Sequence, residues 1–174
     1  GVRVCAVSAG SSRMSAGPSF SLFLTEDGKV YSCGRGSWGM VGHGNEENQL
    51  VPKLIEALSG MRVCAVSAGT EHSLFLTEDG KAYSCGRGDF GVLGHGNPEV
   101  QHVPKLIEAL SGVRVCAVSA GSSHMSAGPS FSLFLTEDGK VYSCGHGDGG
   151  RLGHGNDENQ LVPKLIEALS GMRV

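Results

Sequence analysis

The sequence predicts an all-β protein made of β-propeller blades with about four antiparallel strands each, forming a partial arc of three blades or part of a ring. Three observations lead to this prediction. Nearly the same segment occurs three times, and short runs of β-branched residues recur at fixed places in each copy. Many of the 28 glycines among the 174 residues stand at the turns between those runs.

The repeat defines the units. Equivalent segments open at four glycines spaced by 59, 52 and 59 residues, which are Gly1, Gly60, Gly112 and Gly171. We therefore expect three units and the start of another, at residues 1–59, 60–111, 112–170 and 171–174. Units of this length cannot bury their apolar faces alone, so they are expected to pack against one another as one array.

The second unit is the shortest and shows the elements in order. Arg62–Ala68 is a predicted strand, and Ser73–Thr77 and Ala82–Cys85 are two more, joined by an Asp-Gly hairpin in which both central positions tolerate positive φ. The glycine-dense loop Gly86–Asn97 follows. Val103–Leu110 is then a further strand or a single helical turn, because eight residues are short for a stable helix.

Units one and three carry seven extra residues before the sequence Ser-Leu-Phe-Leu. The extra segments contain the turn pairs Gly17-Pro18 and Gly128-Pro129 and fall between two predicted strands. We expect each to form a longer surface loop.

Charge and composition exclude several classes of partner. The net charge is −3 with acidic and basic residues interspersed, so the chain has no electrostatic footprint for nucleic acid or anionic lipid. No apolar run approaches the roughly 20 residues of a membrane span. The N-terminus has no targeting segment, although a chain that starts at Gly1 can have lost one. Neither a nucleic acid nor a membrane is an expected partner.

Six cysteines occupy two positions of the repeat, both inside predicted strands: Cys5, Cys64 and Cys116 in one, and Cys33, Cys85 and Cys144 in the other. Cysteine in a strand commonly acts as a small buried hydrophobe. We therefore expect reduced structural thiols and a cytoplasmic or nuclear location. The alternative is a disulfide within each unit, if the two positions lie on adjacent strands.

The second unit contains the motif string V-x-x-V-x-x-G-x-x-H-S-L-x-L-T-x-D-G, then Y-S-x-G, L-G-x-G and P-x-x-I-x-x-L. In the second unit these are Val63, Val66, Gly69, His72, Ser73, Leu74, Leu76, Thr77, Asp79, Gly80, Tyr83, Gly86, Leu93, Gly94, Gly96, Pro104, Ile107 and Leu110. The string resembles the regulator of chromosome condensation repeat family over the whole chain. The resemblance implies a propeller of seven blades, of which this chain would supply three near-identical repeats.

The chain departs from the family pattern at two positions. The blade histidine is present as His72 and His124 but is Arg13 in unit one, and cysteine stands where the family often has tryptophan before the glycine. In some members the resemblance implies guanine-nucleotide exchange for a small GTPase, and in others protein or chromatin binding. A plant ultraviolet receptor of the family senses light through clustered tryptophans, whereas Trp38 is the only tryptophan here. The family's exchange residues lie in loops outside the motif and cannot be mapped onto this chain.

Each unit has a cysteine ten residues before a histidine. Two ligands per blade are too few for zinc, and an enzyme does not need the same nucleophile pair three times. We therefore predict no catalytic residue, metal or cofactor. His43, His95 and His154, each in a Gly-His-Gly sequence, are expected to tie a glycine turn. His72 and His124 are expected to hydrogen-bond the backbone of a neighbouring blade.

The copies differ mainly in the loop from Gly34 to Asn45 and its equivalents. Such variation indicates a surface position, so this loop is a candidate rim for a protein partner, with Trp38, Phe90 and Arg151 as anchors. Neutral drift at solvated positions is the alternative. The candidate rim residues are Arg35, Trp38, Met40, Arg87, Asp89, Phe90, His146, Asp148 and Arg151.

The sequence thus favours a non-enzymatic protein–protein interaction scaffold that binds through its glycine-rich rim loops. Guanine-nucleotide exchange on a small GTPase and chromatin binding are the alternatives. Three blades cannot close a ring. We therefore expect the chain to associate with the remaining blades of the same propeller, or with a second copy in a head-to-tail six-bladed ring.

Overall fold

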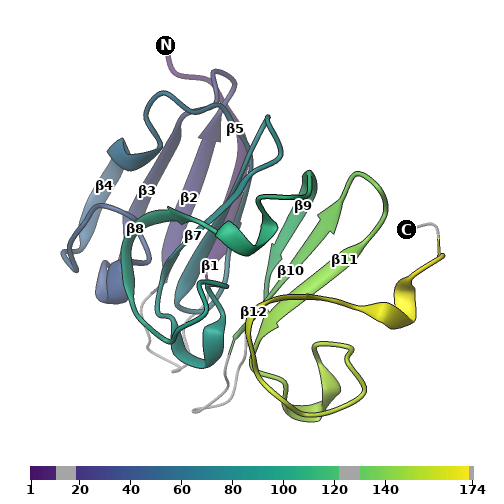
Figure 1. Ribbon diagram of the computed structural model, residues 1–174. Coiled ribbons are helices and arrows are strands. Elements are labelled where there is room, and N and C mark those ends of the chain that lie inside the picture. The colour runs from purple at the N-terminus through teal and green to yellow at the C-terminus, as the bar shows by residue number, and fades with distance from the viewer. Residues whose placement is uncertain (11–18, 122–129, 173–174) are drawn as a thin grey trace.

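A computed structural model describes residues 1–10, 19–121 and 130–172. Within these ranges, three four-stranded antiparallel sheets follow one another along the chain, with hydrogen-bonded neighbours in sequence order (Figure 1). The first sheet contains β1 (Val4–Gly10), β2 (Phe20–Thr25), β3 (Val30–Gly34) and β4 (Gln49–Leu54). The second contains β5 (Val63–Ala68), β6 (His72–Thr77), β7 (Ala82–Gly86) and β8 (Gln101–Leu106). The third contains β9 (Val115–Ala120), β10 (Phe131–Thr136), β11 (Val141–Gly145) and β12 (Gln160–Leu165). This confirms the all-β fold class and the partial arc of blades.

Short 3₁₀ turns complete each blade. One set follows the third strands: η1 (Ser37–Gly39), η3 (Asp89–Gly91) and η5 (Asp148–Gly150). The other set follows the fourth strands: η2 (Glu56–Leu58), η4 (Glu108–Leu110) and η6 (Glu167–Leu169). The segment Val103–Leu110 therefore contains both predicted alternatives, because it includes the end of strand β8 and then the single turn η4. No helix among the described residues is long and apolar enough to span a membrane.

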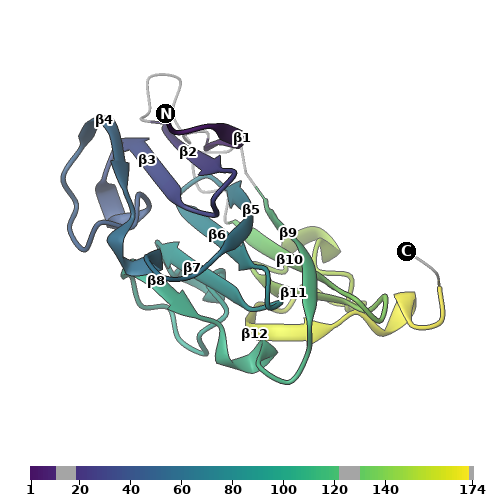
Figure 2. The same ribbon diagram turned by 90° about the horizontal axis from the view of Figure 1, so that it is seen from above.

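The first strands of the blades line the inner side of the arc. Figure 2 shows β1, β5 and β9 along one side of the molecule and β4, β8 and β12 along the other. The inner strands are tied in pairs, because Ala68 N–H donates to Ser8 Oγ (3.0 Å) and Ala120 N–H donates to Ser67 Oγ (2.9 Å).

The hydrophobic core lies between blades. One cluster joins Leu22 and Ile55 of the first blade to Phe75 of the second, and the other joins Leu74 of the second blade to Phe134 of the third. The middle blade is covered on both faces, so every residue of β6 is buried, whereas β10 alternates between buried and partly buried residues. A blade in this arc therefore depends on its neighbours for its core.

The hairpin between the second and third strands differs in detail from its prediction. In the second blade, Gly80 N–H donates to Thr77 O (2.9 Å), and Gly80 alone has positive φ (+79°) while Asp79 does not. Only the glycine position needs the left-handed region, as in a hairpin loop that ends in a bulged glycine. The Thr77 hydroxyl donates to the Asp79 carboxylate (2.5 Å) and accepts from Lys81 N–H (3.2 Å), which fastens the loop to its own base.

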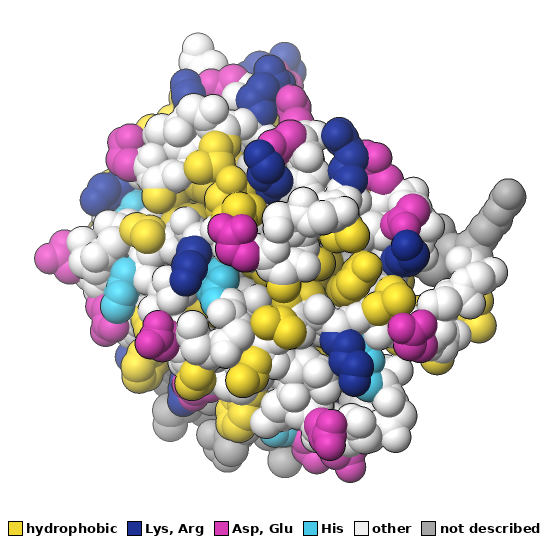
Figure 3. Space-filling model, viewed as in Figure 1, with side chains coloured by type: hydrophobic (Ala, Val, Ile, Leu, Met, Phe, Trp, Pro, Cys, Tyr) yellow, Lys and Arg dark blue, Asp and Glu magenta, His cyan; other side chains and the backbone are white. Residues whose placement is uncertain are grey.

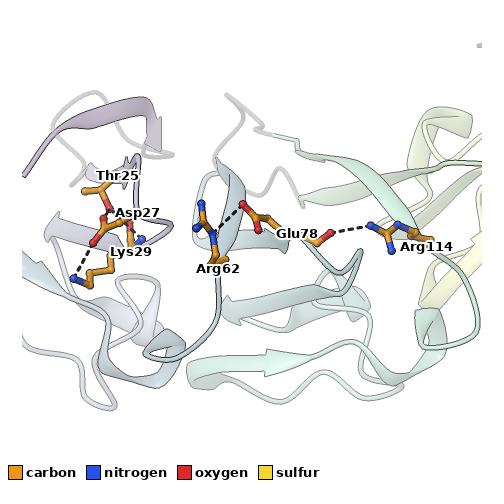
Figure 4. Close-up of polar contacts among 6 residues, drawn as sticks. All are labelled: Thr25, Asp27, Lys29, Arg62, Glu78 and Arg114. Atoms are coloured by element: carbon orange, nitrogen blue, oxygen red, sulfur yellow. Dashed lines mark hydrogen bonds and ion pairs between the residues drawn. The ribbon is translucent and has the colours of Figure 1, made fainter.

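These hairpins also form a joint between blades. The carbonyl of Gly28 accepts from Val63 N–H, and that of Gly80 accepts from Val115 N–H, both at 3.0 Å. Arginines line the same joints, as Figure 4 shows: Arg62 pairs with Glu78 Oε1 (3.0 Å), and Arg114 of the third blade donates to Glu78 O (3.0 Å).

The cysteine expectations were wrong in part. Cys85 and Cys144 are buried as predicted and Cys33 is partly buried, but the other three, Cys5, Cys64 and Cys116, are exposed. Each exposed cysteine lies where the register of the first strand shifts by a bulge, which leaves the residue outside the regular ladder. The disulfide alternative is also wrong, since β2 separates β1 from β3 and all six thiols are free.

Gly80→Val tests the hairpin joint, with Gly139→Val as its matched control. The two glycines have nearly equal φ (+79° and +78°), but a Cβ on Gly80 would lie 2.4 Å from Arg114 Cγ, whereas one on Gly139 has nothing within 4 Å. We expect a loss of about 2 kcal/mol at both sites from the positive φ, and about 1 kcal/mol more at Gly80 from crowding. Urea unfolding measures both. Equal losses of stability would mean that packing against Arg114 does not constrain position 80. A loss below about 0.5 kcal/mol would contradict the positive φ of the turn.

Candidate functional site

The candidate rim consists of the loops after the third strands, residues 34–45, 86–97 and 145–156, which Figure 1 shows together at the lower end of the arc. The loops share one backbone shape. The residue at the tip of each 3₁₀ turn has positive φ: Trp38 at 60°, Phe90 at 61° and Gly149 at 68°. A bulky L-residue with positive φ is strained, so its surroundings must hold it there.

The first and second loops each dock on the next blade by close backbone approach. A Cβ on Gly39 would lie 2.4 Å from His102 Cα, and a Cβ on Gly91 would lie 2.4 Å from Leu161 Cα. Only glycine allows such an approach. In addition, Gly44 N–H donates to His102 O and Gly96 N–H donates to Leu161 O, both at 2.9 Å. The candidate rim is therefore also the joint between blades.

Buried serines secure the same joint. Ser73 Oγ donates to Met40 O and Ser132 Oγ donates to Val92 O, both at 2.7 Å. Met40 is only 2% exposed, so its prediction as a rim residue was wrong. The sequence suggested an exposed position because the residue equivalent to Met40 in the third unit is the polar Arg151. Among the described residues no further blade lies against the third loop, and Arg151 donates from Nε to Asp148 O of its own loop (2.7 Å).

The aromatic candidates are exposed, but each contacts the following blade. Trp38 is 40% exposed and Phe90 is 39% exposed. The Arg87 guanidinium lies 5.1 Å from the Trp38 ring centroid, and the rings of Phe90 and His146 meet edge to face at 4.7 Å. Aromatic side chains that differ between the loops therefore lie at contacts between neighbouring blades.

Arg87 is held from two sides. It forms ion pairs with Glu71 (2.9 Å) and with Asp89. Of the other candidates, Arg35 and Asp148 are exposed and His146 is partly buried. Sequence reasoning missed Glu71, because it precedes a strand far from the variable loop in the chain.

The Gly-His-Gly histidines fasten each loop to its own blade. Nε2 of His43, His95 and His154 lies 2.9 Å from the hydroxyl of Ser32, Ser84 and Ser143, respectively. Each serine donates its proton to a loop carbonyl, so the ring must donate from Nε2. Burial, with a smaller contribution from Lys105, lowers the pKa of His95 to about 4, and the ring is neutral at pH 7. The predicted turn-fastening role is confirmed.

His72 occupies a different place from the one the motif suggested. It begins β6 opposite Gly86, where the other blades have Phe20 opposite Gly34 and Phe131 opposite Gly145. The predicted equivalents His124 and Arg13 lie outside the described residues. His72 Nε2 lies 3.1 Å from Ser132 Oγ, so the ring bonds a side chain of the neighbouring blade and not its backbone.

Burial alone lowers the pKa of His72 to about 4, and its Nδ1 has no hydrogen-bond partner in the structure. Within the described ranges, no group of three or more histidine, cysteine and acidic side chains could hold a metal ion. The face in Figure 3 carries acidic and basic side chains interspersed among apolar ones.

Comparisons with known proteins give a consistent result. Two sequence models of the regulator of chromosome condensation (RCC1) repeat match the chain, one over residues 27–76, 79–134 and 138–174 and the other over residues 4–39 and 63–92. The human E3 ubiquitin-protein ligase HERC2 is 41% identical over 163 residues, which are 92% of this chain and 3% of that protein. The ultraviolet-B receptor UVR8 of Arabidopsis thaliana is 39% identical over 162 residues, 92% of this chain and 35% of the receptor.

Among solved structures, Prp20p of Saccharomyces cerevisiae, reported with its binding properties to Gsp1p and histones, is similar with a TM-score of 0.72 and 26% identity. The match covers 84% of this chain and 36% of Prp20p. The chain thus spans little more than a third of Prp20p and of the ultraviolet-B receptor, and a small fraction of the human ligase.

The buried His72 predicts a loss of stability in acid. Its pKa falls from 6.5 to about 4 on folding, so its contribution is complete above pH 6.5 and is lost as the pH falls toward 4. At pH 5 the loss amounts to about 2 kcal/mol of the free energy of unfolding, because His72 is protonated in the unfolded chain and neutral in the folded one. We expect His72→Phe, which copies Phe20 of the first blade, to fold at pH 7 and to lose that part of the pH dependence in urea titrations. An unchanged profile would contradict the burial of a neutral ring.

The Trp38–Arg87 contact predicts a modest energetic coupling. Trp38→Ala keeps an L-residue at the same φ and removes only the ring, so we expect an intact fold and a loss of about 0.5 to 1 kcal/mol. A double-mutant cycle with Arg87→Ala isolates the pair from the ion pairs of Arg87. A drop of several kcal/mol for Trp38→Ala alone would place the ring in the core instead.

Proposed function

Because the chain belongs to the regulator of chromosome condensation repeat family, we propose that it is a non-enzymatic protein–protein interaction scaffold that binds through its rim loops. The observation that carries this proposal is the exposure of two large aromatic side chains, Trp38 and Phe90, at the tips of adjacent loops. The few residues that dominate the binding energy of protein interfaces are enriched in tryptophan, tyrosine and arginine.

The rigidity of the loops supports the same function. Each of the first two loops is fixed by its own blade through a histidine and by the next blade through a serine, as in the pairs His43 with Ser32 and Ser73 with Met40 O. A surface held in one conformation loses little entropy on binding. Exposed Arg35 and Asp148 add charges of opposite sign at the two ends of the row.

Guanine-nucleotide exchange on a small GTPase is the second candidate. Its support is the similarity to Prp20p, whose structure was reported with binding to Gsp1p. Histone binding by the same protein suggests chromatin as a third partner, but the interspersed charges in Figure 3 provide no basic patch for DNA on that face.

The assembly and the setting of the chain are also proposed. The described arc, with unit boundaries at residues 60 and 112, would belong to a seven-bladed ring completed by further blades, or to a six-bladed ring formed with a second copy. Six free thiols fit a reducing compartment, the cytoplasm or the nucleus.

Rim binding predicts that Trp38→Ala/Phe90→Ala loses the protein's partners. Immobilised wild-type chain, this variant and the control Lys53→Ala/Lys105→Ala, which changes exposed residues of the outer strands, are compared by quantitative mass spectrometry of captured proteins. We expect a set of proteins that the control retains and the rim variant loses. Identical sets would contradict binding through the rim. In parallel, faster release of labelled GDP from Gsp1p by the chain would replace the scaffold-only function with nucleotide exchange.

A further inference from the structure

The chain contains four Asp-Gly pairs, and three of them lie in the hairpins between second and third strands. Each hairpin reads Thr-Glu-Asp-Gly-Lys, at residues 25–29, 77–81 and 136–140, whereas the fourth pair is Asp148-Gly149 in the third rim loop. Glycine leaves the preceding aspartate open to rearrangement, because it has no side chain and the widest backbone freedom.

The rearrangement is an isomerisation that needs only water. The glycine nitrogen forms a bond to the side-chain carboxyl carbon of the aspartate. One carboxyl oxygen then leaves as water, taking the acid proton and the amide proton. A second water adds to the main-chain carbonyl carbon of the resulting succinimide ring and breaks the bond from that carbon to nitrogen. The product is isoaspartate, in which the main chain runs through the former side chain.

The carboxyl group that must be attacked is restrained in the second blade. Asp79 Oδ1 accepts a hydrogen bond from the Thr77 hydroxyl (2.5 Å), and Asp79 Oδ2 pairs with Lys81 Nζ (2.7 Å). Hydrogen bonds to both oxygens favour the ionised carboxylate. An ionised carboxylate has no hydroxyl to lose as water, so the ring cannot close until the group gains a proton.

The other two hairpins repeat these contacts. The threonine hydroxyl lies 2.6 Å from Asp27 Oδ1 in the first blade and 2.5 Å from Asp138 Oδ1 in the third. The lysine ammonium lies 2.8 Å and 2.7 Å from the other oxygen of these two aspartates. The hydrogen bond from Lys29, followed by that from Thr25, lowers the pKa of Asp27 to about 2.

The attacking nitrogen is restrained by the same threonine. Gly80 N–H donates to Thr77 O (2.9 Å), and the corresponding glycine amides of the other two hairpins make the same bond at 2.9 Å. This bond keeps the proton on the nitrogen and fixes the peptide plane. Thr77 therefore holds both reacting groups, the carboxylate through its hydroxyl and the amide through its carbonyl.

Asp148 lacks this arrangement. His146 stands two residues before it and Gly150 two residues after it, where the hairpins have threonine and lysine. The ion pair that the structure describes for its carboxylate is with Arg151 Nη2, at 3.6 Å. Exposure does not separate the four sites, because the hairpin aspartates are themselves 54 to 58% exposed and open to water.

We infer that Asp148 is the aspartyl-isomerisation site of the chain, and that the hairpin threonines guard the other three Asp-Gly pairs against the same reaction. The guard has a consequence for the fold. Isoaspartate would add a carbon to the main chain just before Gly80, whose carbonyl accepts a hydrogen bond from Val115 N–H (3.0 Å). This inference goes beyond the proposed rim function and does not depend on any partner.

The wild-type chain gives the first test. The folded protein is incubated at neutral pH, and isoaspartate at each Asp-Gly pair is quantified by mass spectrometry with fragmentation that separates the two isomers. We expect isoaspartate at Asp148 to accumulate about tenfold faster than at the hairpin aspartates, because both the hydroxyl and the ammonium contacts are missing there. Equal rates at all four sites in the folded chain would overturn the inference.

Thr77→Val tests the guard itself, because it keeps the size of the side chain and removes the hydroxyl. We expect about fivefold faster isomerisation at Asp79 than in wild type, with no change at Asp27 and Asp138 of the same molecule. Thr77→Ser keeps the hydroxyl and is the matched control, which should retain the wild-type rate. An unchanged rate at Asp79, or an equal rise at all three hairpins, in a variant that is folded by circular dichroism would overturn the guard.

Two further variants keep the test independent of the folding of Thr77→Val. Thr25→Val makes the same measurement in the first blade, where only Asp27 should respond. Lys81→Gln removes the other partner of Asp79 from an exposed position and should raise the rate at Asp79 about two- to fivefold. No rise at the aspartate of the substituted hairpin in either variant would contradict the inference.

Discussion

The approach of one blade's loop backbone to the next blade's outer strand is the contact on which the arc depends. At Gly39 and Gly91 a single added methyl group would overlap the Cα of the neighbouring strand. The hydrogen bonds of the serine hydroxyls and glycine amides, and the packing of the apolar clusters between blades, all depend on that spacing. Because the core is shared between blades, a change at the joint acts on the stability of two blades at once.

Local features of the fold could be predicted from the sequence because their causes are local. Alternation of apolar residues and the Asp-Gly pair indicated β6 and β7 almost to the residue. The exposure of Cys64 could not be predicted, since a bulge shifts the register by one residue and only the neighbouring strand shows it. The equivalence of His72 with Phe20 was missed for a similar reason: strand pairing defines it, whereas the motif string placed the histidine before the insert.

Candidate site residues were only partly predictable, because variation has two causes that look alike in a sequence. Met40 and Trp38 both vary between units, yet the first is buried and the second is exposed. Their neighbours in space, Cys85 and Arg87, belong to the following unit. A sequence aligned unit against unit compares each loop with its copies and never with the blade that it touches.

Because each joint takes its loop from one unit and its receiving strand from the next, an exchange of whole units leaves every blade intact and replaces only junctions. Removing the second unit, for example, would bring the Trp38 loop onto a blade that offers His146 in place of Arg87. Inserting a copy of the second unit after itself would create a junction of Phe90 with Arg87. Duplication and loss of repeats in such a chain can therefore change blade order without new mutations, and the compatibility of loop tip and receiving residue would decide which rearranged arrays fold.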